Sequence, residues 1–369
     1  MAKKLKSDKI LFTATLLLVC ASIVMVYSAS AVLALERFQQ PYLFLIKQAL
    51  WMVLGLAMLG IATRIDYRTY RNEVFIWSVV ALVGLMLVAV LFSPPVNGTR
   101  RWFGLGGLGI QPSELAKIGC VLFTALMLER RMHRIDDVSY SVLPIGIVVG
   151  GLVGLILLQP DFGTAMSLLL VTGVMIFAAG LHFRYFVGTM LAVLPIVYVV
   201  LMSAPYRRRR LMAFWDPWAD PLGDGFQIIQ SLIAVGTGGL FGRGLMAGAQ
   251  KLFYLPEPHT DFIYAVIGEE LGLLGATAVL VCFCLITWRG LRTAVRAPDR
   301  FGALLAVGLT TMVAAQAFMN ISVVLGLMPT KGIPLPLVSA GGSSLLITLV
   351  GMGMLVNVSQ HSSADTADA

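Results

Sequence analysis

The sequence predicts an all-α protein that crosses a membrane about ten times. Of its 369 residues, 58% are hydrophobic and only 12% are charged, whereas soluble domains carry about 25% charged residues. The apolar residues form runs of about 20, the length that a helix needs to cross the hydrocarbon core of a bilayer. One long polar stretch, residues 204–261, interrupts this pattern.

Ten spans follow when the apolar runs are taken in order. The polar stretch separates the seventh from the eighth, whereas only the tight turn Gln159-Pro160-Asp161 separates the fifth from the sixth. We therefore expect residues 1–358 to form a single transmembrane domain with one large loop, 204–261, and residues 359–369 to form a disordered tail. The predicted spans are residues 10–34, 46–63, 74–93, 114–131, 142–158, 162–181, 184–203, 262–288, 302–327 and 337–358.

Lysine and arginine are distributed unevenly between the two sets of loops that alternate along such a chain. One set carries most of them, in segments 3–9, 64–71, 130–134, 184 and 289–300. Because positively charged loops stay in the cytoplasm, we expect both termini to be cytoplasmic and the 204–261 loop to be extracytoplasmic. The first apolar run is too long for the core of a signal peptide, so we expect it to remain as the first span.

Composition also limits the partners and cofactors. The formal charge of +8 is typical of cytoplasmic Lys and Arg beside anionic headgroups, so we expect contact with membrane lipids and no nucleic-acid partner. The cysteines lie in apolar runs, and the Cys282-x-Cys284 spacing suits neither a zinc site nor a redox pair. We expect no disulfide, no protein metal site and no cofactor held by a recognisable motif.

Polar residues near membrane depth mark candidate functional positions. Ser113 is a plausible N-cap, and Glu114 and Lys117 then lie three apart on one helix face, where they can form an ion pair. This pair either locks helix packing or places Lys117 beneath an anionic substrate. Trp102, beside Arg101, either anchors the membrane interface or contacts the substrate.

Two further polar tracts interrupt the apolar runs. Asp161 can cap the sixth span and complement its dipole, or it can belong to a site directly. The tract 329–344 is rich in Pro, Gly and Ser, which break helical hydrogen bonding, and such backbone is tolerated at membrane depth only where it lines protein or a watery cavity. Lys331 in this tract is expected to face outside, with an acidic side chain or a phosphate as its partner.

The long loop holds the densest cluster of charge. Its arginine run, 207–210, matches phosphate oxygens bidentately or is simply a solvated charge run. Arg208 and Arg210 are our candidate substrate ligands in this run, and Arg101 and Lys331 are candidates outside it. Glu257 and His259 are candidate contacts too, although His259 is better explained as a packed or hydrogen-bonded side chain.

Asp261 is the candidate catalytic residue because it lies at the mouth of the eighth span, where bilayer meets water and cationic side chains are near. With Glu257 and His259 it supplies too few ligands at fixed spacing for a zinc site. Glu269 and Glu270 lie two turns deeper, where we expect one of them to pair with another helix.

Five motifs, in order, resemble the SEDS family of shape, elongation, division and sporulation proteins, whose members have ten helices. Two further stretches, Phe214-Trp-Asp-Pro-Trp-Ala-Asp-Pro and Met328-Pro-Thr-Lys-Gly, are closer to its division branch than to its elongation branch. The five motifs are Gln111-Pro-Ser-Glu-Leu-Ala-Lys, Gln159-Pro-Asp-Phe-Gly-Thr, His259-Thr-Asp-Phe-Ile, Gly268-Glu-Glu-Leu-Gly and Pro336-Leu-Val-Ser-Ala-Gly-Gly-Ser-Ser.

The resemblance implies a peptidoglycan glycosyltransferase that polymerises lipid II on the outer face of the bacterial cytoplasmic membrane, at the division septum. The family's essential aspartate falls on Asp261, its conserved tryptophan on Trp102, and its buried ion pair on Glu114 and Lys117. A single-span class B penicillin-binding protein and other division proteins are the implied partners.

The reaction inverts the anomeric centre, because an α-linked diphosphate is replaced by a β-1,4 bond. We expect ionised Asp261 to deprotonate the acceptor hydroxyl. Arginines, Lys331 or a divalent cation (Mg²⁺ or Mn²⁺) would meet the diphosphate charge. The alternatives are a lipid II flippase, an elongation-type polymerase, and a non-catalytic scaffold of the division machinery.

Overall fold

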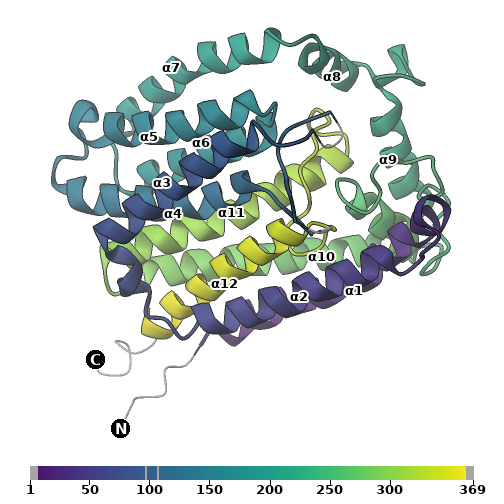
Figure 1. The fold of residues 1–369 in the computed structure, drawn as a ribbon, viewed down its shortest axis with the longest axis horizontal. Helices are drawn as coiled ribbons and strands as arrows, with labels where there is room; N and C mark the ends of the chain where they lie inside the picture. The colour runs from purple at the N-terminus through teal and green to yellow at the C-terminus, as the bar shows by residue number, and fades with distance from the viewer. Residues whose placement is uncertain (1–6, 96–97, 106–107, 363–369) are drawn as a thin grey trace.

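The computed structural model of the chain describes residues 7–95, 98–105 and 108–362. Most helices run along the long axis of the molecule, and the first turn of α1 and the last turn of α12 lie at the same end of it (Figure 1). The helices are α1 (Lys9–Phe38), α2 (Leu43–Ala62), α3 (Glu73–Val90), α4 (Pro112–Arg131), α5 (Val138–Leu158), α6 (Phe162–Ala178), α7 (Phe183–Met202), α8 (Pro205–Trp215), α9 (Phe226–Thr237), α10 (Ile263–Val295), α11 (Arg300–Val324) and α12 (Gly342–Ser362). The shorter elements are η1 (Tyr67–Arg71), β1 (Phe103–Leu105), β2 (Leu108–Ile110), η2 (Met132–Arg134) and η3 (Pro217–Ala219).

The all-α, multi-span fold class is confirmed. Among the described residues, eight helices are long and apolar enough to cross a membrane, and every predicted span overlaps one long helix. Two predicted spans fall outside those eight helices. α4 is less apolar because it carries charged residues, including the buried Glu114 and Lys117, and α6 is short, with 17 residues. The number of ten crossings therefore stays a prediction.

Three predicted boundaries differ from the structure. The last span was expected from residue 337, but α12 begins at Gly342, because the Pro- and Gly-rich tract before it cannot sustain helical hydrogen bonds. The expected disordered tail, 359–369, is helical as far as Ser362, and residues 363–369 lie outside the described residues. The 204–261 loop contains two helices, α8 and α9, and α8 begins with Pro205 in its first turn, where a missing N–H costs nothing.

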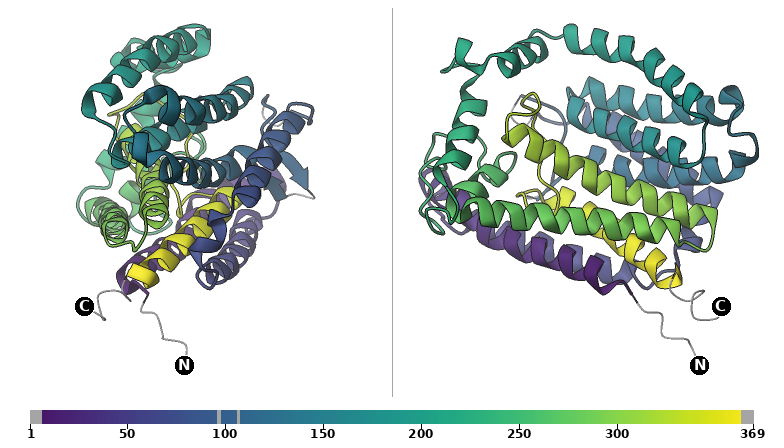
Figure 2. Two further views of the ribbon diagram at one scale, coloured as in Figure 1. Left: turned by 90° about the vertical axis from the view of Figure 1, so that its left-hand side faces the viewer. Right: turned by 180° about the vertical axis from the view of Figure 1, so that it is seen from behind.

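The centre of the bundle is formed by α4, α11 and α12. Nearly all of α4 is buried from Pro112 to Leu128, and α11 and α12 are mostly buried as well. By contrast α7 has no buried residue, and it forms the outer arch of the molecule together with α8 (Figures 1 and 2). The buried polar groups of the core helices therefore have protein around them, whereas α7 is largely exposed and packs against α6 through residues such as Phe186.

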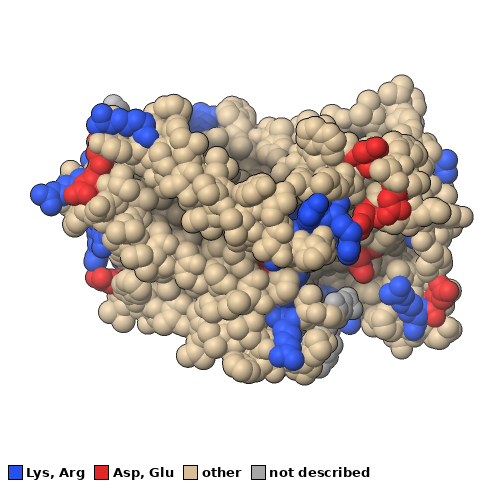
Figure 3. Space-filling model, turned by 90° about the horizontal axis from the view of Figure 1, so that it is seen from above, with Lys and Arg blue, Asp and Glu red and all other residues tan. Residues whose placement is uncertain are grey.

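Ion pairs join the loops at one end of the bundle. Asp8 before α1 pairs with Arg289 of α10 at 2.6 Å, and its backbone N–H donates to the Ser359 hydroxyl at 3.3 Å. Arg130 pairs with Glu73 at 2.6 Å. These are the loops in which Lys and Arg concentrate, and both described chain ends lie among them. From above, charged side chains gather toward the two ends of the molecule with a largely uncharged band between them (Figure 3).

At the other end, α10 is broken at Gly272, whose φ of 66° is in the left-handed region. The backbone N–H groups of 273 and 274 donate to the carbonyls of Gly239 and Leu240 instead of continuing the helix. The carbonyls of Glu269 and Glu270, freed by this break, accept the N–H groups of residues 243 and 244. The 239–244 segment is thus inserted into the helix with its backbone groups paired, as burial away from water requires.

The side chains of Glu269 and Glu270 hold the same insertion. Both are fully buried. Glu270 accepts hydrogen bonds from Lys251 Nζ at 2.5 Å and from the Ser28 hydroxyl of α1 at 2.7 Å. Glu269 accepts the backbone N–H of Ala249 at 2.8 Å. The expectation that one of the two glutamates contacts another helix is confirmed for Glu270.

We expect Glu270→Ala to lower the free energy of unfolding by about 3–5 kcal/mol, because it leaves the Lys251 ammonium buried without its partner. Glu73→Ala, which removes an exposed partner of Arg130, serves as the control and should cost no more than about 1 kcal/mol. Denaturation of the detergent-purified protein, followed by circular dichroism, measures both. Equal losses in the two variants would contradict this account, whereas removing both charges with Lys251→Met and Glu270→Met should recover stability.

Candidate functional site

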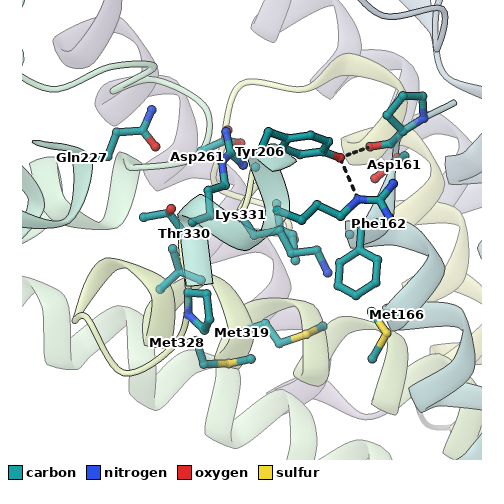
Figure 4. A pocket seen from close by; sticks show the side chains of 18 of the residues that line it. Asp161, Phe162, Met166, Tyr206, Gln227, Asp261, Met319, Met328, Thr330 and Lys331 are labelled. Carbon is teal, nitrogen blue, oxygen red and sulfur yellow. Dashed lines mark hydrogen bonds between the residues drawn. The ribbon is translucent and has the colours of Figure 1, made fainter. Parts of the chain in front are cut away.

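A cavity of about 710 Å³ lies where α6, α8 and α11 meet the loops before α10 and α12. One part of its wall is polar, and the other is made of Met, Leu, Val and Ile side chains (Figure 4). The cavity can therefore hold a molecule that is charged at one end and apolar at the other. Its ionisable lining residues are Arg101, Asp161, Tyr206, Arg207, Arg210, Glu257, Asp261 and Lys331.

Asp261 is held by its backbone against the 329–341 tract. The Asn320 amide of α11 donates to the carbonyls of Asp261 and Ile333, both at 2.7 Å. The Ser339 hydroxyl donates to the Thr260 carbonyl at 2.5 Å. The two loops come so close that a Cβ added to Gly332 would lie 2.9 Å from Asp261 Oδ2, so any side chain there would displace the Asp261 carboxylate.

The Glu114–Lys117 pair is linked to the 329–341 tract through Gln316. Its atoms are 2.8 Å apart and both side chains are buried, and Lys117 also donates to Gln316 Oε1 at 2.7 Å. Gln316 in turn donates to the Pro334 carbonyl at 2.9 Å. Neither Glu114 nor Lys117 lines the cavity. Of the two interpretations, the geometry therefore favours the structural ion pair.

Asp161 fits both of its interpretations. It caps α6, because its carboxylate accepts the backbone N–H and the hydroxyl of Thr164 at 3.1 and 2.8 Å. It also accepts the Gln111 amide at 3.1 Å and lines the cavity. Gly163 follows it in the first turn, and a Cβ there would lie 3.1 Å from the Lys331 side chain. The cap therefore forms part of the cavity wall beside Lys331.

Two of the cavity cations are already engaged by the protein. Arg101 donates to the carbonyls of Gln159 and Pro160 at 2.8 and 2.6 Å. Arg207 donates to the Val200 carbonyl at 2.5 Å and to the Tyr206 hydroxyl at 3.1 Å, a bond drawn in Figure 4. These guanidinium groups fix the shape of the wall.

The other two cations remain available. In the described part of the chain, the side chains of Arg210 and Lys331 form no hydrogen bond and no ion pair, although both line the cavity. The Lys331 ammonium lies 4.6 Å from the centroid of the Phe162 ring, an attraction that keeps it at the wall. Arg210 and Lys331 can therefore meet the charge of an anionic ligand.

Arg208 is not where the sequence analysis expected it. It is exposed on α8 and does not line the cavity. Residues three apart share a helix face, so Arg207 and Arg210 face the cavity together while Arg208 points elsewhere. Arg209 forms an exposed ion pair with Asp224 at 3.3 Å.

Two other candidates lie outside the cavity. The Trp102 ring covers Gly109 of β2, where an added Cβ would lie 3.0 Å from it. His259 is buried with its ring 4.7 Å from that of Phe44, and burial lowers the pKa of its imidazole. His259 is therefore a neutral packed side chain here, whereas its neighbour Glu257 lines the cavity as expected.

The charges around the cavity alter its titration. Burial, reinforced by the Glu257 carboxylate and opposed by Arg210, raises the pKa of Asp261 to about 7. Burial lowers the pKa of the Lys331 ammonium to about 8, and Asp161 opposes this shift. With this pKa, both the neutral form and the expected ionised form of Asp261 are present near neutral pH. Its carboxyl is poised near neutrality, the range in which a general base is most effective.

Sequence reasoning missed several residues that build the site. Gln316 and Asn320 lie within an apolar run: Asn320 connects the two loops, and Gln316 connects Lys117 to the 329–341 tract. A polar side chain at membrane depth is a usable signal. Tyr206 and the apolar wall carried no signal, because nothing local distinguishes them from other membrane residues. Within the described ranges, no three His, Cys, Asp or Glu side chains are grouped as a metal site would need.

Comparison with known proteins gives concordant matches over nearly the whole chain. The family model FTSW_RODA_SPOVE, described as "Cell cycle protein", matches residues 8–364. A probable peptidoglycan glycosyltransferase FtsW of Geobacter sulfurreducens is 43% identical over 357 residues, which are 95% of each chain. The stage V sporulation protein E of Bacillus subtilis is 43% identical over 366 residues, 98% of this chain and 99% of the relative.

Two solved structures share the fold. One, from work on the structural coordination of polymerization and crosslinking by a peptidoglycan synthase complex, superposes with a TM-score of 0.80 at 32% identity, covering 97% of this chain and 99% of that one. The other, the rod shape determining protein RodA of Thermus thermophilus, superposes with a TM-score of 0.70 at 29% identity and covers 96% and 97%.

The titration of Asp261 is directly measurable. We expect the infrared band of its carboxylate, assigned by difference from Asp261→Asn, to titrate with a midpoint of about 7. Glu257→Gln removes a negative charge and should lower this midpoint, whereas Arg210→Ala removes a positive charge and should raise it. Glu257→Asp keeps the charge and is the control. Shifts in the same direction for the Gln and Ala variants would contradict the assignment.

Proposed function

The chain belongs to the FtsW/RodA/SpoVE family, and from this we propose that it is a peptidoglycan glycosyltransferase that polymerises lipid II into glycan strands during cell division. Its curated relatives with this activity in their names are FtsW proteins at 38–43% identity. The solved RodA structure is only 29% identical. These identities favour the division branch over an elongation-type polymerase.

The observation that carries the proposal is the position of Asp261 in one cavity with two unengaged cations. A lipid-linked disaccharide has a polar sugar, a diphosphate and an isoprenoid chain. Arg210 and Lys331 can bind the diphosphate, and the Met, Leu and Val wall can bind the first part of the apolar chain. Asp261, with a pKa of about 7, is suited to accept a proton from the attacking hydroxyl.

The reaction then proceeds by a single displacement. The acceptor 4-hydroxyl oxygen attacks the anomeric carbon of the donor, and its proton passes to the Asp261 carboxylate. The bond between that carbon and the diphosphate oxygen breaks, and the diphosphate leaves with the electron pair while Arg210 and Lys331 offset its charge. Inversion of the anomeric centre follows from attack on the face opposite the leaving group. A divalent cation, bound to the diphosphate oxygens, would supply further charge.

The surroundings fit a bacterial inner membrane protein of the division septum. Both described chain ends lie among the basic loops, which supports cytoplasmic termini, and the cavity lies at the opposite end of the bundle, which supports an active site on the outer face. A class B penicillin-binding protein is the proposed partner, since one fold relative was solved in a peptidoglycan synthase complex. Other division proteins would join the same assembly.

Purified protein supplied with lipid II and Mg²⁺ or Mn²⁺, with and without a class B penicillin-binding protein, should produce a glycan ladder on a gel. Asp261→Asn should keep its fold and partner binding but lose about 10²–10⁴ in rate, because the general base is removed. Wild-type yield from this variant would remove Asp261 from the mechanism. Lipid II crossing proteoliposomes, with no ladder in any preparation, would point to a flippase instead.

Arg210→Ala should raise the KM for lipid II about tenfold or more, since a charge-assisted contact to phosphate is worth about 1.5–3 kcal/mol. Arg209→Ala is the matched control on the same helix, because Arg209 pairs with the exposed Asp224 and does not line the cavity, and its KM should be unchanged. Initial polymerisation rates over a range of lipid II concentrations measure both. Equal effects in the two variants would show that α8 acts through its overall charge rather than through Arg210.

A further inference from the structure

The segment 205–222, comprising α8, η3 and the following turn, has two distinct faces. One face contributes Tyr206, Arg207 and Arg210 to the cavity. The other face of α8 exposes Met212 (60%) and Trp215 (87%), and the η3 turn and the residues after it expose Trp218 (68%) and Leu222 (87%). An exposed apolar surface of this size marks a site of contact with a membrane or another protein.

What occupies this face is indicated by its continuity with α7. α7 is apolar enough to cross a membrane and has no buried residue, so lipid must cover most of its surface, although Phe186 packs against Phe177 of α6. It ends at Met202, and α8 begins at Pro205. Three residues span at most about 11 Å, so α8 begins close to the level at which α7 leaves the acyl chains.

The position of α8 along the molecule agrees with this. α8 lies level with the outer ends of α10 and α11 rather than beyond them (Figures 1 and 2). Met212 and Trp215 lie three apart on α8 and share a face. Arg208, four residues before Met212, belongs to the same face and is exposed. Tryptophan and arginine beside aliphatic residues are typical of segments that lie in the membrane interface.

We propose that segment 205–222 lies in the outer headgroup layer of the bilayer, with Met212, Trp215, Trp218 and Leu222 directed toward the acyl chains. Interfacial helices insert their apolar face about 5–10 Å into this boundary, while Arg208 reaches lipid phosphates. The same segment carries Arg207 and Arg210 on its other face. Anchoring of the segment therefore holds Arg207 and Arg210 at the depth of the diphosphate of a membrane-bound lipid. This consequence rests on the proposed function.

Tryptophan quenching tests the anchoring without any enzymatic assay. The full chain is reconstituted in phosphatidylcholine–phosphatidylglycerol vesicles whose lipids carry bromine near the headgroup end of the acyl chain. The emission attributed to Trp215 and Trp218, obtained by subtracting that of the variant Trp215→Phe with Trp218→Phe, should be quenched by the bromine and protected from aqueous iodide. Trp288→Phe, at the opposite end of α10, is the control for the subtraction.

Quenching by iodide but not by bromine would overturn the proposal, because the segment would then lie in water. Protection from both quenchers that appears only when a class B penicillin-binding protein is added would also overturn it, by identifying a protein interface.

The depth-setting role has a separate readout. Replacing Trp215 and Trp218 together by Ser should raise the KM for vesicle-bound lipid II about fivefold, equivalent to about 1 kcal/mol, with kcat and the Asp261 titration midpoint unchanged. An unchanged KM would overturn this role even where bromine quenching has established the anchoring. A lower kcat together with a shifted Asp261 titration midpoint would show that the substitutions disturb the cavity itself. That result would also overturn the depth-setting role.

Discussion

The Asn320 side chain holds together the two loops on which the site depends. Its amide donates to the carbonyls of Asp261 and Ile333, and these carbonyls belong to backbone that leaves helical geometry near membrane depth. Lipid offers no hydrogen bonds there, so each such group must find a protein partner. Asn320 and the Lys117–Gln316 chain supply these partners. The irregular backbone around the cavity is therefore stable only because α4 and α11 are buried helices that carry polar side chains.

The same requirement explains the second irregular region. At Gly272 the helix α10 opens to admit residues 239–244, and the two buried glutamates pair with the N–H groups and the lysine that the insertion brings with it. The insertion and the Gly272 break lie before and after Asp261 in the chain, whereas the 329–341 tract contacts residues 260 and 261 in space. The Asp261 backbone is held by Asn320, and the neighbouring Thr260 carbonyl by Ser339, while the Asp261 carboxyl itself forms no hydrogen bond among the described residues. Rigidity of the loop and reactivity of the carboxyl are provided by different groups.

The four cationic side chains of the cavity also fall into two groups. Arg101 and Arg207 donate to protein oxygens and so define the wall, whereas the side chains of Arg210 and Lys331 have no hydrogen-bond partner among the described residues. Lys331 is also desolvated enough to lower its pKa to about 8, so its charge is present at neutral pH and interacts strongly with an anion in a site of low polarity. The outer face of α8 links this arrangement to the membrane, because the helix that presents Arg210 also presents Trp215 to the bilayer.

The sequence by itself determined the membrane class, the approximate course of the long helices, the pairing of Glu114 with Lys117 and the prominence of Asp261. Each of these follows from local hydrophobicity or from spacing along one helix, which a linear pattern records. It could not show that Arg207 rather than Arg208 joins Arg210 in the cavity, that residues 204–261 contain α8 and α9, or that Asn320 connects two loops. Those features depend on which helix face meets which neighbour across large separations in the chain, and only the packed structure specifies that.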